Sequence, residues 1–388
     1  MTADADPDVY LMAFACEPGR GSEPGVGYAF ARALGEYARD SSGRATVVTR
    51  PHRVERIRAA LRADGVTRLD VLAVPLPGVV VRLTGRRFVR VAYLLWQWRA
   101  VRAVARRIED RGRPAVVHHV TFATEGLPTF ETRLAGRAAL VFGPAGSSAS
   151  EGGEGAARRL RRRLASPVLR RTDVLVAQNS HVAAAWRAAA GRGRVVVEPN
   201  IVIEPAPANE PAWDVVVVGR LIPRKRVDLA IRAFALHGSA GRMGIVGDGP
   251  LEPVLRRLVQ ELGVEDRVEF LGWRDRDEVL DILSRARVLL HTSRQEGATW
   301  VVGEAQARGA HPVAERGTGA DSVIDLAAFG TVVDVATPAT LASALGTALA
   351  EAPRVPTARW SGARLPTALE DWYRTALVIS RATTEGSR

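Results

Sequence analysis

The sequence contains very little cysteine and no long hydrophobic run. Cys16 is the single cysteine among 388 residues, which excludes an intramolecular disulfide and a zinc cluster built from cysteines. No stretch of 18 or more apolar residues is present, and Met1 to Pro7 lacks the basic and apolar regions of a secretory signal. We therefore expect a cytoplasmic protein in which Cys16 is a small buried residue at a strand end.

Acidic residues are missing from two arginine-rich segments of this chain, whose formal net charge is +12. Arg82 to Arg107 contains eight arginines, and Arg158 to Arg171 contains seven. The first segment also has apolar residues at helical spacing: Phe88, Val91, Leu95, Trp98, Val101, Ala105 and Ile108. Both segments are either solvated helix faces packed on the core or surfaces for anionic lipid, a lipid phosphate or nucleic acid. Lipid binding would place the protein at the inner face of the membrane.

The motifs that normally accompany nucleic-acid binding are absent. The sequence has no zinc-finger spacing, no aromatic RNP-like strand and no helix-turn-helix pattern. We therefore expect no nucleic-acid partner.

Short apolar segments alternate with helical patterns along the chain, which predicts parallel strands with helical crossovers. A proline-rich segment, residues 197–213, interrupts this alternation and predicts an interdomain linker. Expected helices in the second half cover Val227 to His237, Leu251 to Leu262, Glu278 to Arg285 and Val301 to Arg308. The fold class is therefore α/β, with two doubly wound domains that face a cleft. The apolar helical stretch near the end could pack on either domain.

Ligand sites in such folds lie at the carboxyl ends of the strands. In the first half, "ACEPGRGSEPGVGY" places Gly19, Gly21, Gly25 and Gly27 before a helix, where the backbone either approaches a phosphate or simply turns. In the second half, "GRLIPRK" carries Arg220 and Lys225, which suit a diphosphate without a metal or are solvated surface charges.

The segment "SRQEGATWVVGEAQARG" holds two carboxylates at different depths of the expected site. Glu296 precedes the loop Gly297 to Trp300, whose amides point toward the cleft, and Glu304 lies about one turn inside the following helix. Carboxylates accept hydrogen bonds from hydroxyl pairs, whereas amides, arginine and lysine suit a pyrophosphate. A nucleotide sugar would satisfy the whole set.

These residues resemble the retaining family 4 glycosyltransferases. "EGATWVVGE" is similar to their E-x7-E motif, "GRLIPRK" to their G-R-L-x-x-x-K turn, and "VGDGPLEPVLRRLVQELGVEDRVEFLG" to their donor domain. In the first half, "ACEPGRGSEPGVGY", "HHVTFATEGLPTF" and "VFGPAG" look like a branch that acts on bacterial polysaccharides, O-antigens or glycosylated natural products.

The resemblance implies the two-Rossmann GT-B architecture. Residues 1–205 would bind a hydroxyl acceptor, residues 206–360 would bind a nucleotide-diphosphate sugar, with UDP or GDP as the nucleotide, and residues 361–388 would form a helix that crosses back to the first domain. It also implies a hexosyl transfer with retained anomeric configuration, without a metal, a cofactor or an enzyme nucleophile.

The resemblance also implies roles for single residues. Arg220 and Lys225 would bind the donor diphosphate, Glu304 the ribose and Glu296 the donor sugar near the reacting carbon. Other donor contacts are expected from Gly25, Gly27, Gly247, Gly272, Trp273, Gly297, Thr299, Trp300 and Val301, of which Gly272 and Trp273 would lie near the nucleobase.

The chain departs from the family pattern at three places. "VFGPAG" lacks a histidine that many members carry. His119, at the end of the preceding strand, would either make a catalytic contact in the cleft or be a structural histidine. The backbone at Gly143 and Gly146 would approach the sugar. "RGTGADSVI" replaces a Gly-Gly-x-x-E turn and leaves Asp321 as the acidic residue. "DRD" at 275–277 resembles a metal-binding motif, but its position before a helix predicts a cap.

Two alternatives to glycosyl transfer stay open. One is a nucleotide-sugar epimerase or hydrolase on the same architecture, which would turn over its donor without an acceptor. The other is a non-catalytic anion-binding scaffold, although such a protein would have no physical need for Arg220, Lys225, Glu296 and Glu304 together.

Overall fold

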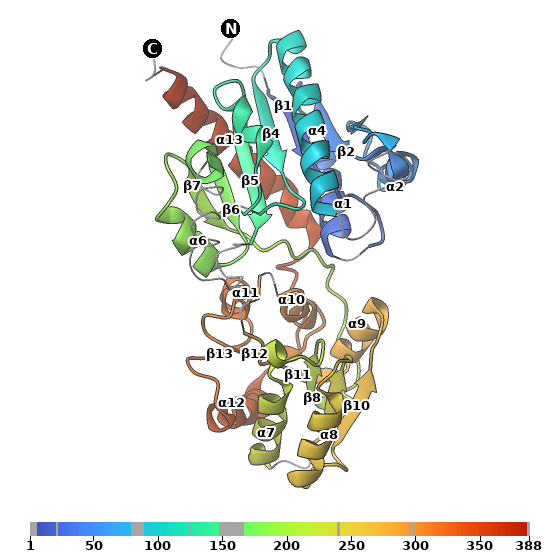
Figure 1. Cartoon of the computed structure of the whole chain (residues 1–388). Coiled ribbons are helices and arrows are strands. Elements are labelled where there is room, and N and C mark those ends of the chain that lie inside the picture. The colour runs from blue at the N-terminus through green and yellow to red at the C-terminus, as the bar shows by residue number, and fades with distance from the viewer. Residues whose placement is uncertain are drawn as a thin grey trace. The chain divides into compact units, whose positions relative to one another are not determined.

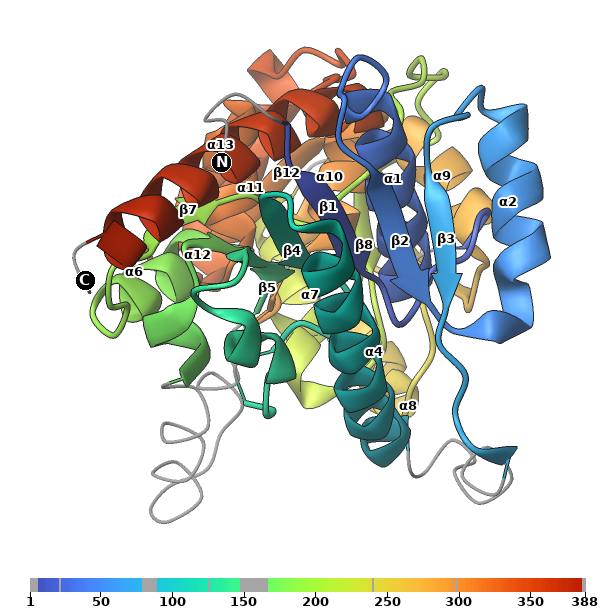
Figure 2. The same ribbon diagram turned by 90° about the horizontal axis from the view of Figure 1, so that it is seen from above.

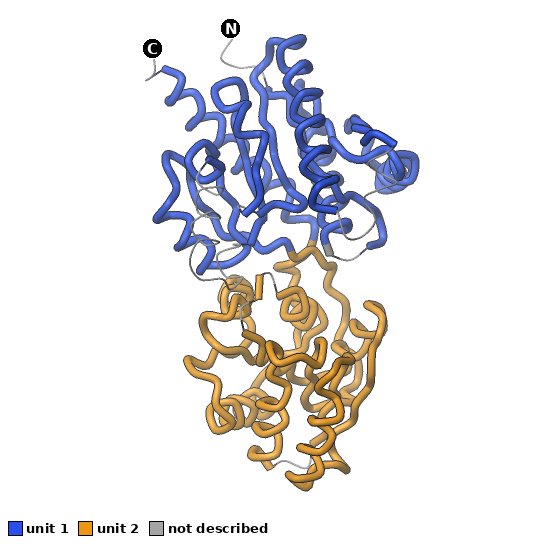
Figure 3. The backbone as a smooth tube through the Cα atoms, viewed as in Figure 1, with its two compact units in different colours: residues 1–200, 362–388 blue, residues 201–361 orange. Residues whose placement is uncertain are grey.

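The computed structural model describes residues 6–20, 22–78, 89–124, 126–146, 167–238, 241–294, 296–297 and 299–385. It contains two compact units, shown in Figures 1 and 3. Unit 1 comprises Met1–Asn200 and Gly362–Arg388, and unit 2 comprises Ile201–Ser361. The boundaries expected from the sequence were 205/206 and 360/361.

Unit 1 is built on a seven-stranded, fully parallel sheet with the order β3-β2-β1-β4-β5-β6-β7. Its strands are β1 (Asp8–Met12), β2 (Ala45–Thr49), β3 (Asp70–Ala73), β4 (Ala115–His119), β5 (Ala139–Ala145), β6 (Val174–Ala177) and β7 (Arg194–Val197). The residues of β1, β2, β4, β5 and β6 are all buried, as expected for parallel strands covered on both faces.

Helices cover both faces of this sheet. They are α1 (Ser22–Tyr37), α2 (Val54–Ala63), α4 (Val89–Arg111), α6 (Ser180–Arg187) and α13 (Leu365–Glu385), with the 3-10 segments η1 (Pro51–Arg53), η3 (Phe130–Leu134) and η6 (Gly362–Arg364). Figure 2 shows α4 and α13 on opposite sides of the strands. The paired histidines of β4 reflect this layering, because His118 contacts Tyr373 of α13 whereas His119 contacts Tyr93 of α4.

The arginine-rich segment Arg82 to Arg107 overlaps α4, and its residues 82–88 lie outside the described part of the chain. The helix is confirmed, but its predicted apolar stripe is partly wrong. Val101 and Ile108 are buried as expected, whereas Val91 is 56% exposed. The buried face instead runs through Ala92, Tyr93, Trp96, Gln97, Ala100, Val101, Val104 and Ile108. Most of the second segment, Arg158 to Arg171, also lies outside the described residues.

Unit 2 is built on a six-stranded parallel sheet with the order β10-β9-β8-β11-β12-β13. Its strands are β8 (Trp213–Val218), β9 (Met243–Val246), β10 (Val268–Gly272), β11 (Ala286–His291), β12 (His311–Glu315) and β13 (Thr331–Val333). Two apolar cores flank the sheet, one beneath α7, α8 and α12 and the other beneath α9, α10 and α11.

The helices of unit 2 lie close to their predicted positions. They are α7 (Val227–His237), α8 (Glu252–Glu261), α9 (Arg276–Ser284), α10 (Trp300–Ala307), α11 (Ala320–Ala327) and α12 (Pro338–Glu351), with η5 (Pro223–Lys225) before α7. Among the described residues of both units, no helix is long and apolar enough to cross a membrane.

Candidate functional site

Three of the predicted donor residues of unit 2, Arg220, Lys225 and Glu296, follow two strands that are neighbours at the centre of the sheet, β8 and β11. The chain runs from β8 outward through β9 and β10, then returns to the centre and runs outward the other way through β11, β12 and β13. The strand order therefore reverses between β8 and β11. In open α/β sheets, ligands bind at the carboxyl ends of the strands at such a reversal.

Lys225 and Glu296 meet at this point. Lys225 ends η5 after β8, Glu296 follows β11, and Lys225 Nζ lies 2.7 Å from Glu296 Oε1. The guanidinium of Arg224 is 3.6 Å from the same oxygen. Burial alone would raise the pKa of Glu296, but the nearby positive charges, Lys225 foremost, outweigh it and lower that pKa. The side chains of Lys225 and Glu296 are 17% and 14% exposed.

The turn that carries Lys225 is tied to the end of β11. The Thr292 hydroxyl donates to the carbonyl oxygens of Lys225 and Arg226 at 2.8 and 3.0 Å. Arg226 adopts a left-handed backbone conformation, donates from Nε to the Thr292 carbonyl at 2.7 Å, and forms an ion pair with Glu315. These bonds fix the backbone around Lys225 and therefore the position of its ammonium group.

Two glycines bring the strand ends of β8, β9 and β10 close together. Gly247 has φ +129°, and a Cβ there would lie 2.1 Å from the carbonyl oxygen of Gly219. The Gly247 amide also donates to the Gly272 carbonyl at 2.8 Å. At Gly219, with φ +152°, a Cβ would lie 3.2 Å from Lys225 Cε. Both positions therefore favour glycine, and the bare backbone leaves room for the lysine stem.

Arg220, the second predicted diphosphate ligand, is exposed directly after this strand end. Within the described part of the chain, its guanidinium forms no hydrogen bond or ion pair. Besides Lys225 and Arg224, which both contact Glu296, the site thus offers Arg220 as an exposed cation.

Glu304 lies inside α10 and is paired with an arginine that the sequence analysis did not single out. Its Oε1 is 3.1 Å from Nε of Arg276, at the start of α9, and the Glu304 side chain is 10% exposed. The Arg276 guanidinium also lies 5.4 Å from the centre of the Trp300 ring. Arg276 and Glu304 are 28 positions apart in the sequence, so no local sequence motif predicts their contact.

The loop before α10 contains a polar group without a partner. Thr299 is the N-cap residue of α10, its side chain makes no capping bond, and its buried Oγ1 has no hydrogen-bond partner among the described residues, which leave out 295 and 298. Buried hydroxyls normally find one. Thr299 was predicted to contact the donor, and this hydroxyl is available for such a contact. Trp273, the predicted nucleobase neighbour, is 67% exposed.

Two aspartates have structural partners. Asp321 accepts hydrogen bonds from the amides of Gly317 and Gly319 at 2.9 and 3.0 Å, within its own turn. Asp275 forms a capping box with Glu278 at the start of α9, which confirms the cap predicted for "DRD". Among the described residues, no three His, Cys, Asp or Glu side chains come together as metal ligands.

Gly25 and Gly27 lie inside the first turns of α1, not before the helix as predicted. The physical reason is close packing at the helix start. A Cβ at Gly25 would lie 1.9 Å from the Arg20 carbonyl oxygen, and one at Gly27 would lie 2.0 Å from that of Ala15. Glycine is therefore required at both positions by packing, and donor contact from them stays a prediction.

His119 lies in the interior of unit 1, 2% exposed. Its Nε2 is 2.7 Å from the Tyr93 hydroxyl, and its Nδ1 is 2.9 Å from Glu131 Oε1. Burial would lower the pKa of His119, but the Glu131 carboxylate outweighs it and raises that pKa. These contacts give His119 a structural role, and a catalytic role stays a prediction. His118 is also buried, with Nε2 2.8 Å from the Gly143 carbonyl.

The family comparison concerns unit 2. Residues 201–358 match the model of a family described as glycosyl transferases group 1. Unit 2 belongs to the group 1 glycosyl transferases. The match covers the lysine turn after β8, the strand ends with Gly247 and Gly272, and both carboxylates, Glu296 and Glu304.

Two curated glycosyltransferases are similar to part of this chain. The phosphatidylinositol N-acetylglucosaminyltransferase gpi3 subunit of Schizosaccharomyces pombe is 32% identical over 148 residues, 36% of this chain and 32% of that protein. The lipopolysaccharide core biosynthesis glycosyltransferase LpsE of Rhizobium meliloti is 32% identical over 146 residues, 37% of this chain and 41% of that protein. The chain thus spans less than half the length of these relatives.

A solved structure matches both units of the chain in fold. Anabaena Alr3699/HepE in complex with UDP has a TM-score of 0.52 at 17% identity, and the match covers 98% of this chain and 99% of that one. This likeness concerns the fold alone. The predicted α/β fold class, with two doubly wound parallel sheets as in GT-B glycosyltransferases, is confirmed.

Proposed function

We propose that this protein is a retaining, metal-independent glycosyltransferase that moves a sugar from a nucleotide-diphosphate sugar to a hydroxyl acceptor. Unit 2 would hold the donor, a UDP- or GDP-sugar, and unit 1 the acceptor. The observation that carries this proposal is the Lys225–Glu296 pair, fixed where the strand order reverses in a group 1 glycosyl transferase unit. The UDP in the HepE structure supports a nucleotide donor.

Lys225 and Arg220 would neutralise the departing diphosphate. An ammonium group carries three N–H donors, so Lys225 can keep its bond to Glu296 while it donates to a phosphate oxygen. Arg220 is exposed and can turn toward the same diphosphate. Preorganised cations stabilise charge that develops in the transition state, which is the task a metal performs in other transferases.

The two carboxylates would bind the other parts of the donor. Glu304 would accept hydrogen bonds from the ribose hydroxyls, and Glu296 would contact the sugar beside the anomeric carbon. The acceptor oxygen attacks that carbon from the side of the leaving group, and the bond from the anomeric carbon to the phosphate oxygen breaks. The acceptor proton passes to the departing phosphate, so the sugar keeps its configuration and no enzyme nucleophile is needed.

Isothermal titration with UDP, GDP, ADP and dTDP, each with and without EDTA, tests the donor site. We expect one nucleotide to bind with the same affinity in both conditions. Loss of that binding in EDTA would contradict metal independence, and no binding of any nucleotide would favour the anion-binding scaffold.

A turnover assay then separates transfer from its closest alternative. The corresponding nucleotide sugar is incubated with the protein, with and without hydroxyl acceptors, and nucleotide release is measured. We expect release that depends on the acceptor. Turnover without any acceptor would identify a nucleotide-sugar epimerase or hydrolase instead.

A further inference from the structure

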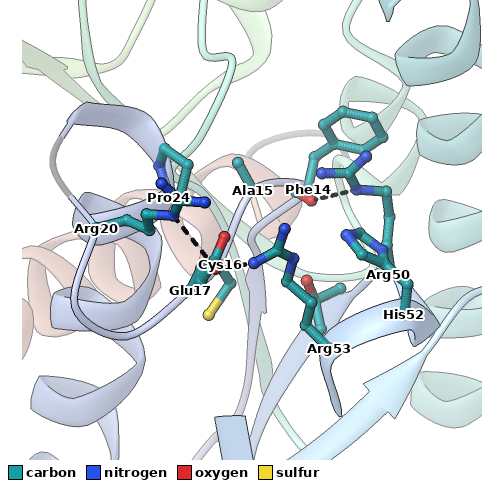
Figure 4. A pocket seen from close by; sticks show the side chains of 10 residues that line it. Phe14, Ala15, Cys16, Glu17, Arg20, Pro24, Arg50, His52 and Arg53 are labelled. Carbon is teal, nitrogen blue, oxygen red and sulfur yellow. Dashed lines mark hydrogen bonds and ion pairs between the residues drawn. The ribbon is translucent and has the colours of Figure 1, made fainter. Parts of the chain in front are cut away.

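Unit 1 contains a cavity of about 430 Å³ whose wall is rich in cations (Figure 4). It lies at the carboxyl ends of β1 and β2, between the segment Phe14–Glu17 and the segment Thr49–Arg53. The corresponding edge of unit 2 holds the proposed donor site. None of the residues with a role in donor binding lines this cavity.

One buried carboxylate in the cavity wall is surrounded by three arginines. Glu17 is 5% exposed, and its Oε1 lies 3.4 Å from Arg20 Nε and 3.3 Å from an Arg56 nitrogen. Arg53 contacts the same oxygen. Figure 4 shows the side chains of Arg20 and Arg53 reaching Glu17 from opposite sides. One carboxylate neutralises only one of these three guanidinium groups.

Arg50 lines the cavity together with Arg20 and Arg53 but has no carboxylate partner, whereas Arg56 contacts Glu17 without lining the cavity. Arg50 donates from Nε to the Phe14 carbonyl at 2.9 Å, and its guanidinium lies 4.1 Å from the centre of the Phe14 ring. Within the described residues it has no ion pair. Burial lowers its pKa, and burial together with the Arg50 charge lowers the pKa of the adjacent His52. Three guanidinium groups, those of Arg20, Arg50 and Arg53, and one carboxylate, that of Glu17, therefore line the cavity, which leaves a net charge of +2.

Such crowding of like charges is unfavourable unless an anion completes the cluster. Guanidinium groups present planar pairs of N–H donors, the geometry that suits phosphate oxygens. A phosphate monoester carries up to two negative charges and offsets the surplus better than a single carboxylate does. The cavity is also larger than a bare ion requires, which favours a phosphate attached to a larger group.

We propose that this cavity binds a phosphoryl group of the acceptor. The assignment rests on the proposed function only in naming the acceptor as its ligand. A second hollow of about 460 Å³ shares Phe14, Arg50 and His52 with the first and is lined further by Pro51, Leu76, Val89 and Ala92. The group esterified to the phosphate would lie there, and its source is either a lipid or a sugar.

The test is isothermal titration of the full chain with inorganic phosphate, hexyl phosphate and glucose 1-phosphate. A Lys225→Ala background removes the proposed donor-phosphate contact in unit 2. We expect saturable binding of the esters, tighter than that of phosphate alone. A preference for hexyl phosphate identifies a lipid phosphate, and a preference for glucose 1-phosphate a sugar phosphate. Absence of saturable binding by all three probes overturns the proposal.

Three variants locate the binding. Arg50→Gln and Arg53→Gln should each weaken ester binding by about tenfold or more, the loss of one charge-assisted bond. Arg137→Gln removes the same charge from unit 1. Arg137 lies at the amino end of β5, whereas the cavity lies at the carboxyl ends of the strands, so ester affinity should stay unchanged. Equal effects in all three variants would overturn the assignment to this cavity.

A fourth variant gives a gain that misfolding cannot mimic. Glu17→Gln keeps the side-chain shape and removes the competing negative charge, so ester affinity should rise by about tenfold, with a larger increase in Tm on adding ester. Unchanged or weaker affinity in the folded variant would show that the arginines only form ion pairs with Glu17 and bind no ester, which would overturn the proposal. UDP binding, measured in the wild type, reports on the donor site separately, so either hypothesis can fail alone.

Discussion

The ammonium of Lys225 and the carboxylate of Glu296 lie 2.7 Å apart, although 71 residues separate them in the sequence. The parallel sheet brings them together, because each follows one of two adjacent central strands, β8 and β11. The lysine is therefore held in place before any ligand arrives. Its partner is also the residue proposed to contact the donor sugar.

Lys225→Ala should weaken binding of the preferred nucleotide diphosphate by about 1.5 to 3 kcal/mol, since one charge-assisted bond is lost. Isothermal titration measures the change. Arg232→Ala, which removes an exposed charge from α7, is the matched control and should bind like the wild type. Unchanged affinity in Lys225→Ala would show that the diphosphate does not bind at Lys225.

Glu296→Gln should separate binding from transfer. Without the carboxylate, Lys225 is free to donate fully to a diphosphate, so nucleotide affinity should stay the same or rise. The transfer rate should fall by about 100-fold, because a contact beside the reacting carbon is lost. Titration and initial rates on one preparation are compared. A parallel loss of affinity and rate would instead indicate that Glu296 only holds the lysine.

Glu304→Gln should reduce discrimination for ribose. The wild type should bind the ribonucleoside diphosphate about tenfold more tightly than the 2′,3′-dideoxy analogue, because a charged acceptor loses its hydroxyl partners in the analogue. The variant should bind both with similar, weaker affinity. If the wild type and the variant show the same preference, Glu304 does not bind the ribose hydroxyls and only forms the ion pair with Arg276.

Anionic vesicles should bind the protein weakly and in a salt-dependent manner. The apolar face of α4 is buried in unit 1, so exposed arginines such as Arg102, Arg106 and Arg107 would act by charge alone. Replacing these three by Gln should cost about 1 kcal/mol each at low salt. Vesicle sedimentation at rising salt measures this. Equal binding to neutral vesicles, or none to anionic ones, would assign the arginines to a solvated face.

Mild acid should destabilise unit 1 through His118. Burial, together with the charge of His119, lowers the pKa of His118 to about 3, below its value of 6.5 in the unfolded chain. The folded state therefore binds fewer protons, and stability present above pH 6.5 is lost as the pH falls, by about 1.4 kcal/mol per pH unit.

Urea denaturation between pH 6.5 and 5 measures this slope before most carboxylates titrate. His118→Gln should flatten the slope by about 1.4 kcal/mol per pH unit, while the exposed His181→Gln should leave it unchanged. His291, whose pKa burial and Lys225 lower to about 4, adds a slope of the same sign in unit 2. An unaltered slope in His118→Gln would show that this histidine is not protonated on unfolding.

The sequence predicted the elements whose signals are local. The helix expected over Val227 to His237 matches α7, because its apolar period is regular and Gly238, in a left-handed conformation, ends it. The proposed donor residues could be named from the sequence because their motifs lie in single short segments, and their roles stay predictions. The buried face of α4 was predicted wrongly because Gln97 lies in the core, where it donates to the Tyr93 hydroxyl. A pattern of apolar residues alone does not indicate that a polar amide is buried.

Contacts between residues that lie far apart in the sequence could not be predicted from it. Nothing local links Arg276 to Glu304, and the cationic cavity of unit 1 depends on β1 and β2 being adjacent. One signal was nevertheless present there. "TRPHRVER" repeats arginine every three residues directly after a strand, at Arg50, Arg53 and Arg56, and a basic repeat at a strand end deserves the same reading as a glycine-rich one.

The placement of α13 has a consequence for synthesis of the chain. Tyr373 of this helix bonds to His118 at 2.9 Å, and Trp372 stacks on Phe30, so the last helix completes a core begun more than 300 residues earlier. On the ribosome, all of unit 2 emerges before unit 1 can close. Unit 2 can therefore fold before α13 covers the middle strands of unit 1, chiefly β5, and a premature stop after residue 361 would leave these strands exposed on the α13 side.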